Sequence, residues 1–227
     1  MLRCSPQASL LRRCRAVKSL NRQIVKLSNR KIVKLLYIHG FASAGSSGTA
    51  VHLRNMLYEY GVEVISPDIP VMPIEALAFL HQLVTEEQPS LIIGTSMGGL
   101  YTEQMYGVPR IMVNPSFHMA RHLTFQGLGK REFLNKRQDG AKDFRVDKEM
   151  IAQFREVEKT SFSKITEEEK TRVWGCFGKN DKFVNCQPEF KKAYGNAHFQ
   201  LFDGEHRLND IVLKHDIFPL IKQILNI

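Results

Sequence analysis

A serine flanked by glycines is the first feature of this sequence with possible chemistry. Residues 94–98 read Gly-Thr-Ser-Met-Gly, after the apolar run SLIIG at 90–94 and before a helix-like stretch at 97–106. A strand that turns through Gly-x-Ser-x-Gly into a helix exposes the serine hydroxyl and aims the next N–H at developing negative charge. The pattern predicts a nucleophilic Ser96, although a structural glycine turn beside an uninvolved serine would give the same letters.

A nucleophilic serine needs a base, and that base needs a group that orients it. The histidines after Ser96 are His118, His122, His198, His206 and His215. We favour His206 as the base, because it lies in FDGEHR, between the last predicted strand and the closing helix. His198 stands at the start of that strand, and His215 falls inside the helix.

Asp181 is the predicted acid of this set. It lies in FGKNDKFV after a predicted strand at 171–178, which should bring it to the sheet edge that carries Ser96. Asp203 and Glu205 compete, but each is so near His206 in sequence that it would more easily serve the local turn. An aspartate at such a position is also common in Asx-turns and helix N-caps, so this structural interpretation of Asp181 stays open.

An oxyanion formed at Ser96 would need two hydrogen-bond donors. The backbone N–H groups of Met97 and of Phe41, in the HGF sequence after the first predicted strand, are the candidates. His39 is expected to be a structural hydrogen-bonding residue. Phe41, Met97 and Val184 are predicted to line an apolar substrate pocket, unless they are only core residues.

The segment Gly40–Ser47 permits a different class of function. It nearly spells the phosphate-binding pattern G-x-x-x-x-G-K-[ST], but Ser46 stands where the lysine would be. The missing lysine, and the lack of an acidic residue placed to hold magnesium, weigh against a nucleotide-binding protein. A third alternative is a catalytically silent scaffold that only binds a partner.

The order of the predicted elements places these residues on an α/β fold. Apolar runs predict strands at 34–40, 62–68, 90–94, 110–116, 171–178 and 198–204, and helical patterns predict helices at 52–61, 75–86, 97–106 and 208–225. Continuous apolar strands separated by helices indicate a mostly parallel six-stranded sheet with helices on both faces. The candidate residues then all follow strands, at the carboxyl edge where ligands bind.

Residues 117–170 interrupt this alternation. They hold six of the 14 phenylalanines among mixed charges, and Val146, Met150, Ile151, Phe154 and Val157 outline one amphipathic helix. Thr166 with Glu169 predicts a capping box for another helix. We interpret the segment as a helical cap inserted into one domain of residues 31–227, with a further sheet-covering layer as the alternative.

The net charge of +9 comes almost entirely from residues 1–30, which hold eight Lys or Arg and no Asp or Glu. The rest of the chain holds 24 basic and 23 acidic residues, so it gives no reason to expect nucleic-acid binding. The basic extension, predicted to be poorly ordered, fits a transit peptide, an amphipathic surface anchor or a non-functional extension. Four cysteines without a dense framework favour a reducing, cytoplasmic setting, and no apolar run is long enough to span a membrane.

With these residues identified, the chain resembles the α/β-hydrolase superfamily and, within it, the small bacterial YqiA/YcfP-like esterases. The resemblance spans roughly residues 33–226 and rests on LLYIHGF, GTSMGG, NPS, FGKND and GEHR. It implies a compact sheet and hydrolysis of a small acyl ester or thioester without a metal or organic cofactor. Carried onto this chain, the catalytic triad would be Ser96, Asp181 and His206.

Overall fold

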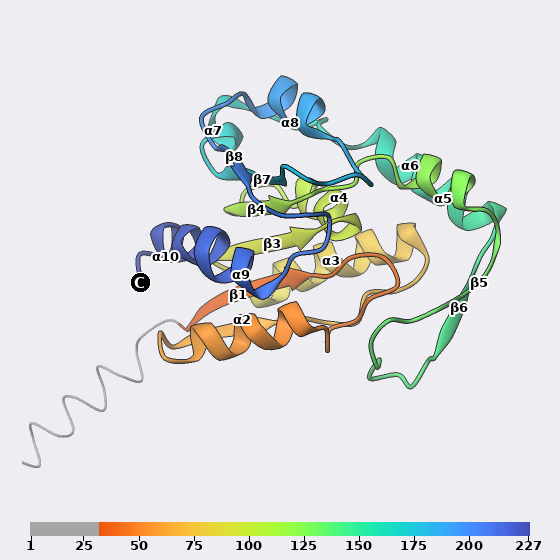
Figure 1. The fold of residues 1–227 in the computed structure, drawn as a ribbon, viewed down its shortest axis with the longest axis horizontal. Coiled ribbons are helices and arrows are strands. Elements are labelled where there is room, and N and C mark those ends of the chain that lie inside the picture. Colours follow the sequence, from red (N-terminus) through yellow and green to blue (C-terminus); the bar gives the residue numbers. More distant parts are fainter. Residues whose placement is uncertain (1–31) are drawn as a thin grey trace, which may run out of the picture. The chain divides into compact units, whose positions relative to one another are not determined.

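Six short apolar runs form the central sheet of the computed structural model, which describes residues 32–227. The strands are β1 (Val33–Ile38), β2 (Val62–Ile65), β3 (Leu91–Thr95), β4 (Arg110–Val113), β7 (Val173–Gly178) and β8 (Phe199–Phe202). They lie in the order β2-β1-β3-β4-β7-β8, and every neighbouring pair is parallel. The predicted α/β class and the six-stranded sheet are confirmed (Figure 1). The basic extension predicted at 1–30 lies outside the described residues.

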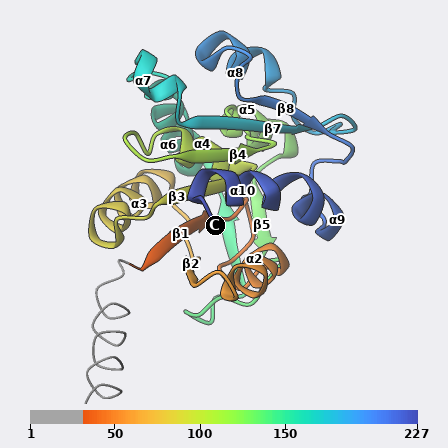
Figure 2. The ribbon, with the colours of Figure 1, turned by 90° about the vertical axis from the view of Figure 1, so that its left-hand side faces the viewer.

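Alternate residues of each strand enter different cores, as the period of a strand requires. Along β1, Leu36 and Ile38 join the core on one face, whereas Leu35 and Tyr37 join the core on the other. The first face is covered by α3 (Pro73–Glu87), α4 (Met97–Glu103) and α8 (Gln187–Tyr194). The second is covered by α2 (Gly48–Tyr58), α9 (Asp210–Val212), η1 (Leu213–Ile217) and α10 (Phe218–Leu225). Figure 2 shows α3 and α2 on opposite sides of β1 and β3.

The chain from 208 to 225, predicted as one helix, is divided in three. The middle part, η1, has π-helical hydrogen bonding, and the N–H of Phe218 donates to the carbonyl of Leu213 at its end. Pro219, in the first turn of α10, has no N–H to continue the α-helical ladder. A local change to wider hydrogen bonding accommodates that missing donor.

The segment at 117–170 contains three helices and an unpredicted hairpin. These are α5 (Met119–Gln126), α6 (Lys148–Lys159), α7 (Glu167–Lys170) and the antiparallel strands β5 (Gly129–Glu132) and β6 (Asp143–Val146). The predicted amphipathic helix is α6, which buries Met150, Ile151, Phe154 and Val157, but Val146, which was predicted with them, ends strand β6. The hairpin was missed because its alternating residues are mostly charged and only partly buried.

The inserted segment shares one core with the sheet. Phe117, Leu123, Val146 and Phe154 belong to the same buried cluster as Leu36 of β1, and α6 packs against α3 and α5. In Figure 1, α5, α6 and the β5–β6 hairpin lie beyond the ends of the strands, on the side where the site described below is found. No helix within residues 32–227 is long and apolar enough to cross a bilayer.

The predicted capping box at Thr166 is half correct. The Thr166 hydroxyl accepts a hydrogen bond from the N–H of Glu169, as an N-cap should. The Glu169 carboxylate does not return to Thr166; it pairs with the buried Arg110 and accepts the N–H of Gly107. A buried guanidinium without a partner would be costly, so this tertiary pair replaces the local one.

Candidate active site

Ser96 stands at the sharp turn between β3 and α4, with backbone angles φ 54° and ψ −118°. A Cβ at Gly94 would lie 2.1 Å from the Thr102 hydroxyl oxygen, and a Cβ at Gly98 would lie 2.1 Å from the Ile38 carbonyl oxygen. Neither position can take a larger residue without moving a neighbouring element. The two glycines therefore allow a turn that a serine adopts only under strain.

The side chains predicted as a triad meet at this turn. Ser96 Oγ lies 2.9 Å from His206 Nε2, and His206 Nδ1 lies 2.7 Å from Asp181 Oδ2. Because a carboxylate only accepts hydrogen bonds, Nδ1 is assigned the proton, and Nε2 accepts the serine hydroxyl. The three residues follow β3, β7 and β8, so parallel strands bring them to one edge.

Asp181 serves both the turn and the histidine. Its Oδ1 accepts the N–H groups of Phe183 and Val184 at 2.8 and 3.0 Å, while Oδ2 faces His206. Burial favours the neutral acid, but the hydrogen bonds from His206 and the two N–H groups outweigh burial and lower the pKa of Asp181. The carboxylate is therefore held ionised beside the imidazole. The competing Asp203 accepts a hydrogen bond from Asn180 instead.

Asn114 holds the backbone that carries His206. Its side-chain NH₂ donates to the carbonyls of Glu205 and His206 at 2.9 and 3.0 Å, and its Oδ1 accepts the Gly178 N–H at 2.7 Å. The residue is buried with φ 44°, a conformation that asparagine tolerates better than most residues. Sequence reasoning missed this role, although Asn114 lies in the NPS sequence on which the family resemblance partly rests.

The segments that carry the two predicted oxyanion donors both adjoin Ser96. Met97 is the first residue of α4, and a Cβ at Gly40, the neighbour of Phe41, would lie 3.4 Å from Ser96 Cβ. Within residues 32–227, the N–H groups of Phe41 and Met97 make no hydrogen bond.

His39 fixes the loop that carries Phe41. Its Nδ1–H donates to the Gly40 carbonyl at 2.9 Å, and its Nε2 accepts the Ile69 N–H at 3.3 Å. Burial lowers the pKa of His39, which outweighs the hydrogen bond to Gly40 that favours the charged form. The neutral imidazole is required because Nε2 must stay an acceptor.

The predicted pocket residues differ in their surroundings. Phe41 is half-buried and packs edge-on against Phe144 of β6, with ring centroids 5.2 Å apart. Val184 is also half-buried, whereas the side chain of Met97 is almost enclosed in the core. Phe183, which sequence reasoning did not single out, is 78% exposed with its ring centroid 5.8 Å from that of His206.

The Gly40–Ser47 loop uses its polar groups internally. Gly45 N–H donates to Asp68 Oδ1 at 2.8 Å, and the Ser46 hydroxyl donates to the Lys136 carbonyl. The Ser47 hydroxyl caps α2 by accepting the Ala50 N–H. A carboxylate thus occupies a donor that a phosphate would need, which argues against the nucleotide alternative.

Solved structures place this architecture among α/β hydrolases. Est1E from Butyrivibrio proteoclasticus with ferulic acid bound is 17% identical over 88% of this chain and 92% of that chain, with a TM-score of 0.60. Alpha/beta hydrolase domain-containing protein 10 from mouse is 13% identical over 86% and 90%, with a TM-score of 0.59. A thioesterase domain from the curacin biosynthetic pathway is 14% identical over 86% and 92%, with a TM-score of 0.51. The protein therefore has an α/β-hydrolase fold.

Residues 34–222 match the family described as uncharacterised protein family UPF0227. This match covers most of the chain, so the protein belongs to that family, as the YqiA/YcfP-like resemblance predicted.

Proposed function

We propose that this protein is a serine hydrolase that cleaves acyl esters or thioesters through Ser96, His206 and Asp181. The observation that carries the proposal is the unbroken line of hydrogen bonds from the Ser96 hydroxyl through His206 to Asp181, at 2.9 and 2.7 Å. A neutral imidazole oriented by a carboxylate is the arrangement that makes a serine hydroxyl nucleophilic.

In the acylation step, Ser96 Oγ attacks the acyl carbonyl carbon while His206 Nε2 takes the hydroxyl proton. The carbonyl π electrons move to oxygen, and the tetrahedral oxyanion accepts hydrogen bonds from the N–H groups of Phe41 and Met97. Collapse of this intermediate breaks the bond to the leaving alcohol or thiol, which receives the proton from His206. Each preorganised donor is worth about 10²–10³ in kcat.

In the deacylation step, water replaces the leaving group. His206 removes a proton from the water as the water oxygen attacks the acyl-enzyme. The second tetrahedral intermediate then collapses and releases the carboxylic acid, while His206 returns the proton to Ser96 Oγ. Asp181 stays ionised throughout and stabilises the imidazolium that forms in both steps. Its low pKa supports that role.

The substrate class is proposed on chemistry and on analogy. Phe41, Val184 and the exposed Phe183 offer apolar surface beside the triad for an acyl or aromatic group. Est1E holds ferulic acid, and the curacin domain is a thioesterase; we extend those substrate classes to this chain only as a proposal. Met97 contributes its N–H rather than its enclosed side chain.

A fluorophosphonate probe followed by peptide mapping tests the nucleophile. We expect one label on Ser96, and we expect Ser96→Ala to abolish both labelling and p-nitrophenyl ester hydrolysis with little change in Tm. Ser116→Ala is the matched control, because Ser116 Oγ also contacts a histidine, His122 Nδ1, at 3.2 Å. Ester turnover that survives Ser96→Ala would contradict the mechanism, and an unlabelled, inactive wild type would favour the silent binding protein.

A further inference from the structure

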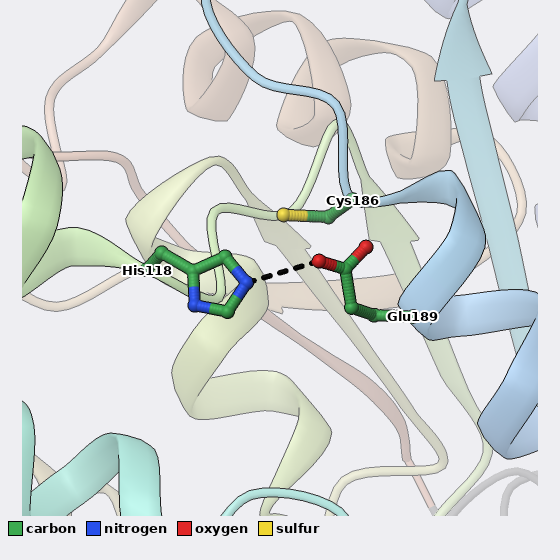
Figure 3. A group of neighbouring side chains, drawn as sticks. All are labelled: His118, Cys186 and Glu189. Atoms are coloured by element: carbon green, nitrogen blue, oxygen red, sulfur yellow. Dashed lines mark hydrogen bonds and ion pairs between the residues drawn. The ribbon is translucent and has the colours of Figure 1, made fainter.

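A second group of reactive side chains, outside the Ser96 site, gathers between the start of the inserted segment and α8. His118, Cys186 and Glu189 place one nitrogen, one sulfur and one carboxylate oxygen all within 4.8 Å of one another. His118 Nε2 already lies 3.0 Å from Glu189 Oε1. Figure 3 shows the sulfur, the carboxylate and the imidazole directed toward the same small space.

These three side chains come from the N-terminal ends of two helices. Cys186 is the N-cap residue of α8, and Glu189 lies three residues later in its first turn, so both side chains share one face of the helix. His118 comes from the other direction, as the N-cap residue of α5. Two rigid elements far apart in sequence thus bring their ligand atoms together.

One atom of the cluster is left unsatisfied. Glu189 Oε2 is buried, and within residues 32–227 it has no hydrogen-bond partner. Cys186 is itself 2% exposed and forms no disulfide with a described residue. A buried carboxylate oxygen without a donor is costly, so this oxygen indicates a missing positive partner.

The electrostatic surroundings favour a cation. The carboxylates of Glu189, Asp181 and Glu158 all place negative charge near the Cys186 sulfur. Glu158 is itself committed elsewhere, since its Oε1 accepts the Ala120 N–H. A thiolate, a carboxylate and a neutral imidazole together would carry the two negative charges that balance a divalent ion.

We propose that His118, Cys186 and Glu189 form a binding site for a zinc-type divalent cation. A sulfur ligand selects borderline or soft metals, and oxygen-preferring Mg²⁺ and Ca²⁺ do not use thiolates. Zinc takes thiolate sulfur at about 2.3 Å and imidazole nitrogen or carboxylate oxygen at about 2.0–2.2 Å. Ligand atoms around a tetrahedral zinc ion lie about 3.5 Å apart. The three ligand atoms here lie within 4.8 Å of one another, so small rotations of the side chains bring them to that spacing.

Binding is a proton-for-metal exchange at sulfur. The thiol S–H bond breaks, its electron pair forms the bond to the cation, and the proton passes to water. The His118 proton that faces Glu189 Oε1 moves from Nε2 to Nδ1 through water, which frees the Nε2 lone pair for the cation. The side chains of His118 and Glu189 are 47% and 38% exposed, so a water molecule can reach the fourth position. The bound ion would fasten α8 to the chain entering α5. The proposal does not rest on the hydrolase function.

Cobalt substitution tests the site directly. The metal-free full-length chain would be titrated with Co²⁺. A Cys4→Ser, Cys14→Ser double variant serves as the background, so that Cys176 and Cys186 are the cysteines that remain. We expect one Co²⁺ per chain, with a near-ultraviolet thiolate-to-cobalt charge-transfer band and tetrahedral visible bands. We also expect Zn²⁺ to displace the cobalt and to raise Tm.

Two variants identify the ligands independently. Cys186→Ser should abolish the charge-transfer band. His118→Ala, at a half-exposed position, should keep the fold and weaken Co²⁺ binding at least about 10-fold. His215→Ala, on an exposed histidine of η1, is the matched control and should bind like the background. Absence of Co²⁺ binding, or binding that keeps its band and affinity in both ligand variants, would overturn the proposal.

Discussion

Two clusters in this protein contain nearly the same chemistry and arrange it differently. Each has one histidine, one carboxylate and one hydroxyl or thiol: Ser96, Asp181 and His206 in the first, and Cys186, Glu189 and His118 in the second. In the first cluster, the imidazole uses both nitrogens, at 2.9 and 2.7 Å, and the groups stand in a line. In the second, the three ligand atoms surround one space.

The linear arrangement suits the first cluster to proton transfer, and the convergent arrangement suits the second to the cation binding proposed above. A line gives each group one neighbour on either side, so a proton can move along it and a carboxylate can orient the base. In the second cluster, His118 Nε2 contacts Glu189 Oε1 at 3.0 Å and Glu189 Oε2 has no partner among residues 32–227, and a bound cation would give the three side chains a common partner. The two proposed chemistries therefore differ through the direction of the side chains and not through residue type.

Removing the middle of the line should have the largest effect. We expect His206→Ala to lower kcat for a p-nitrophenyl ester by about 10⁴-fold or more, because both the base and its contact with Asp181 are lost. Steady-state kinetics with His215→Ala as the matched control would measure this. Equal losses in both variants would show that the line of hydrogen bonds is not the catalytic feature.

Neutralising Asp181, at the end of the line of hydrogen bonds, should have the second-largest effect on kcat. In Asp181→Asn, the side-chain oxygen can still accept the N–H groups of Phe183 and Val184, but its NH₂ would face His206 Nδ1 and favour the wrong tautomer. We expect kcat to fall by about 10³–10⁴-fold with Tm nearly preserved. Asp203→Asn removes a nearby carboxylate outside the line and should stay close to wild type. A small effect at Asp181 would imply that another group orients the imidazole.

Removing the Asn114 side chain, which holds the backbone of His206, should lower kcat less than either change above. Asn114→Ala removes three hydrogen bonds that fix the backbone around His206 and Gly178. We expect kcat to fall by about 10²-fold with a smaller change in KM, since a misplacement near 1 Å has that effect. The free energy of unfolding should also drop by about 1–3 kcal/mol. Asn180→Ala, which loses only its contact with Asp203, is the control; an equal fall in kcat there would remove Asn114 from the positioning role.

The smallest expected effect is on the free energy of unfolding, and it comes from His39, which supports the loop of Phe41. The folded-state pKa of His39 is lowered from 6.5, so the unfolded chain binds its proton more readily. Its stabilising contribution is thus fully present above pH 6.5 and is lost as pH falls from there toward the lowered value. Protonation would also bring an N–H against that of Ile69, which costs about 1–3 kcal/mol.

Urea unfolding of wild type and His39→Gln across this pH range measures that contribution. The variant should be less stable at pH 7.5, and its stability should depend less on pH below 6.5. The pKa values of His81 and His122 are also lowered, but both residues remain in both proteins, so their effects cancel in the difference. Parallel pH curves for the two proteins would contradict the assignment.

The sequence predicted the sheet, the elbow and the three members of the line, because their signals are local. A continuous apolar run predicts a buried strand, and the small residues around Ser96 follow from the close approach of Gly98 to Ile38. Strand ends of a parallel sheet then bring Asp181 and His206 to Ser96 without any knowledge of side-chain packing.

Other features could not be predicted locally. The β5–β6 hairpin pairs charged residues across a long loop. The Glu169 carboxylate does not make the expected capping contact because it pairs with Arg110, which a distant strand buries beside it. Asn114 acts through the backbone of residues that only the folded chain brings near.

By itself, the sequence determined which strands form the central sheet, which serine stands at the strained turn, and which acid and histidine follow strands at the same edge, since each depends on neighbours along the chain. The tertiary structure alone decided that His118 would face Cys186 and Glu189. That meeting depends on how α8 packs on the sheet relative to the inserted segment, and contacts between such distant elements leave no local pattern in the chain.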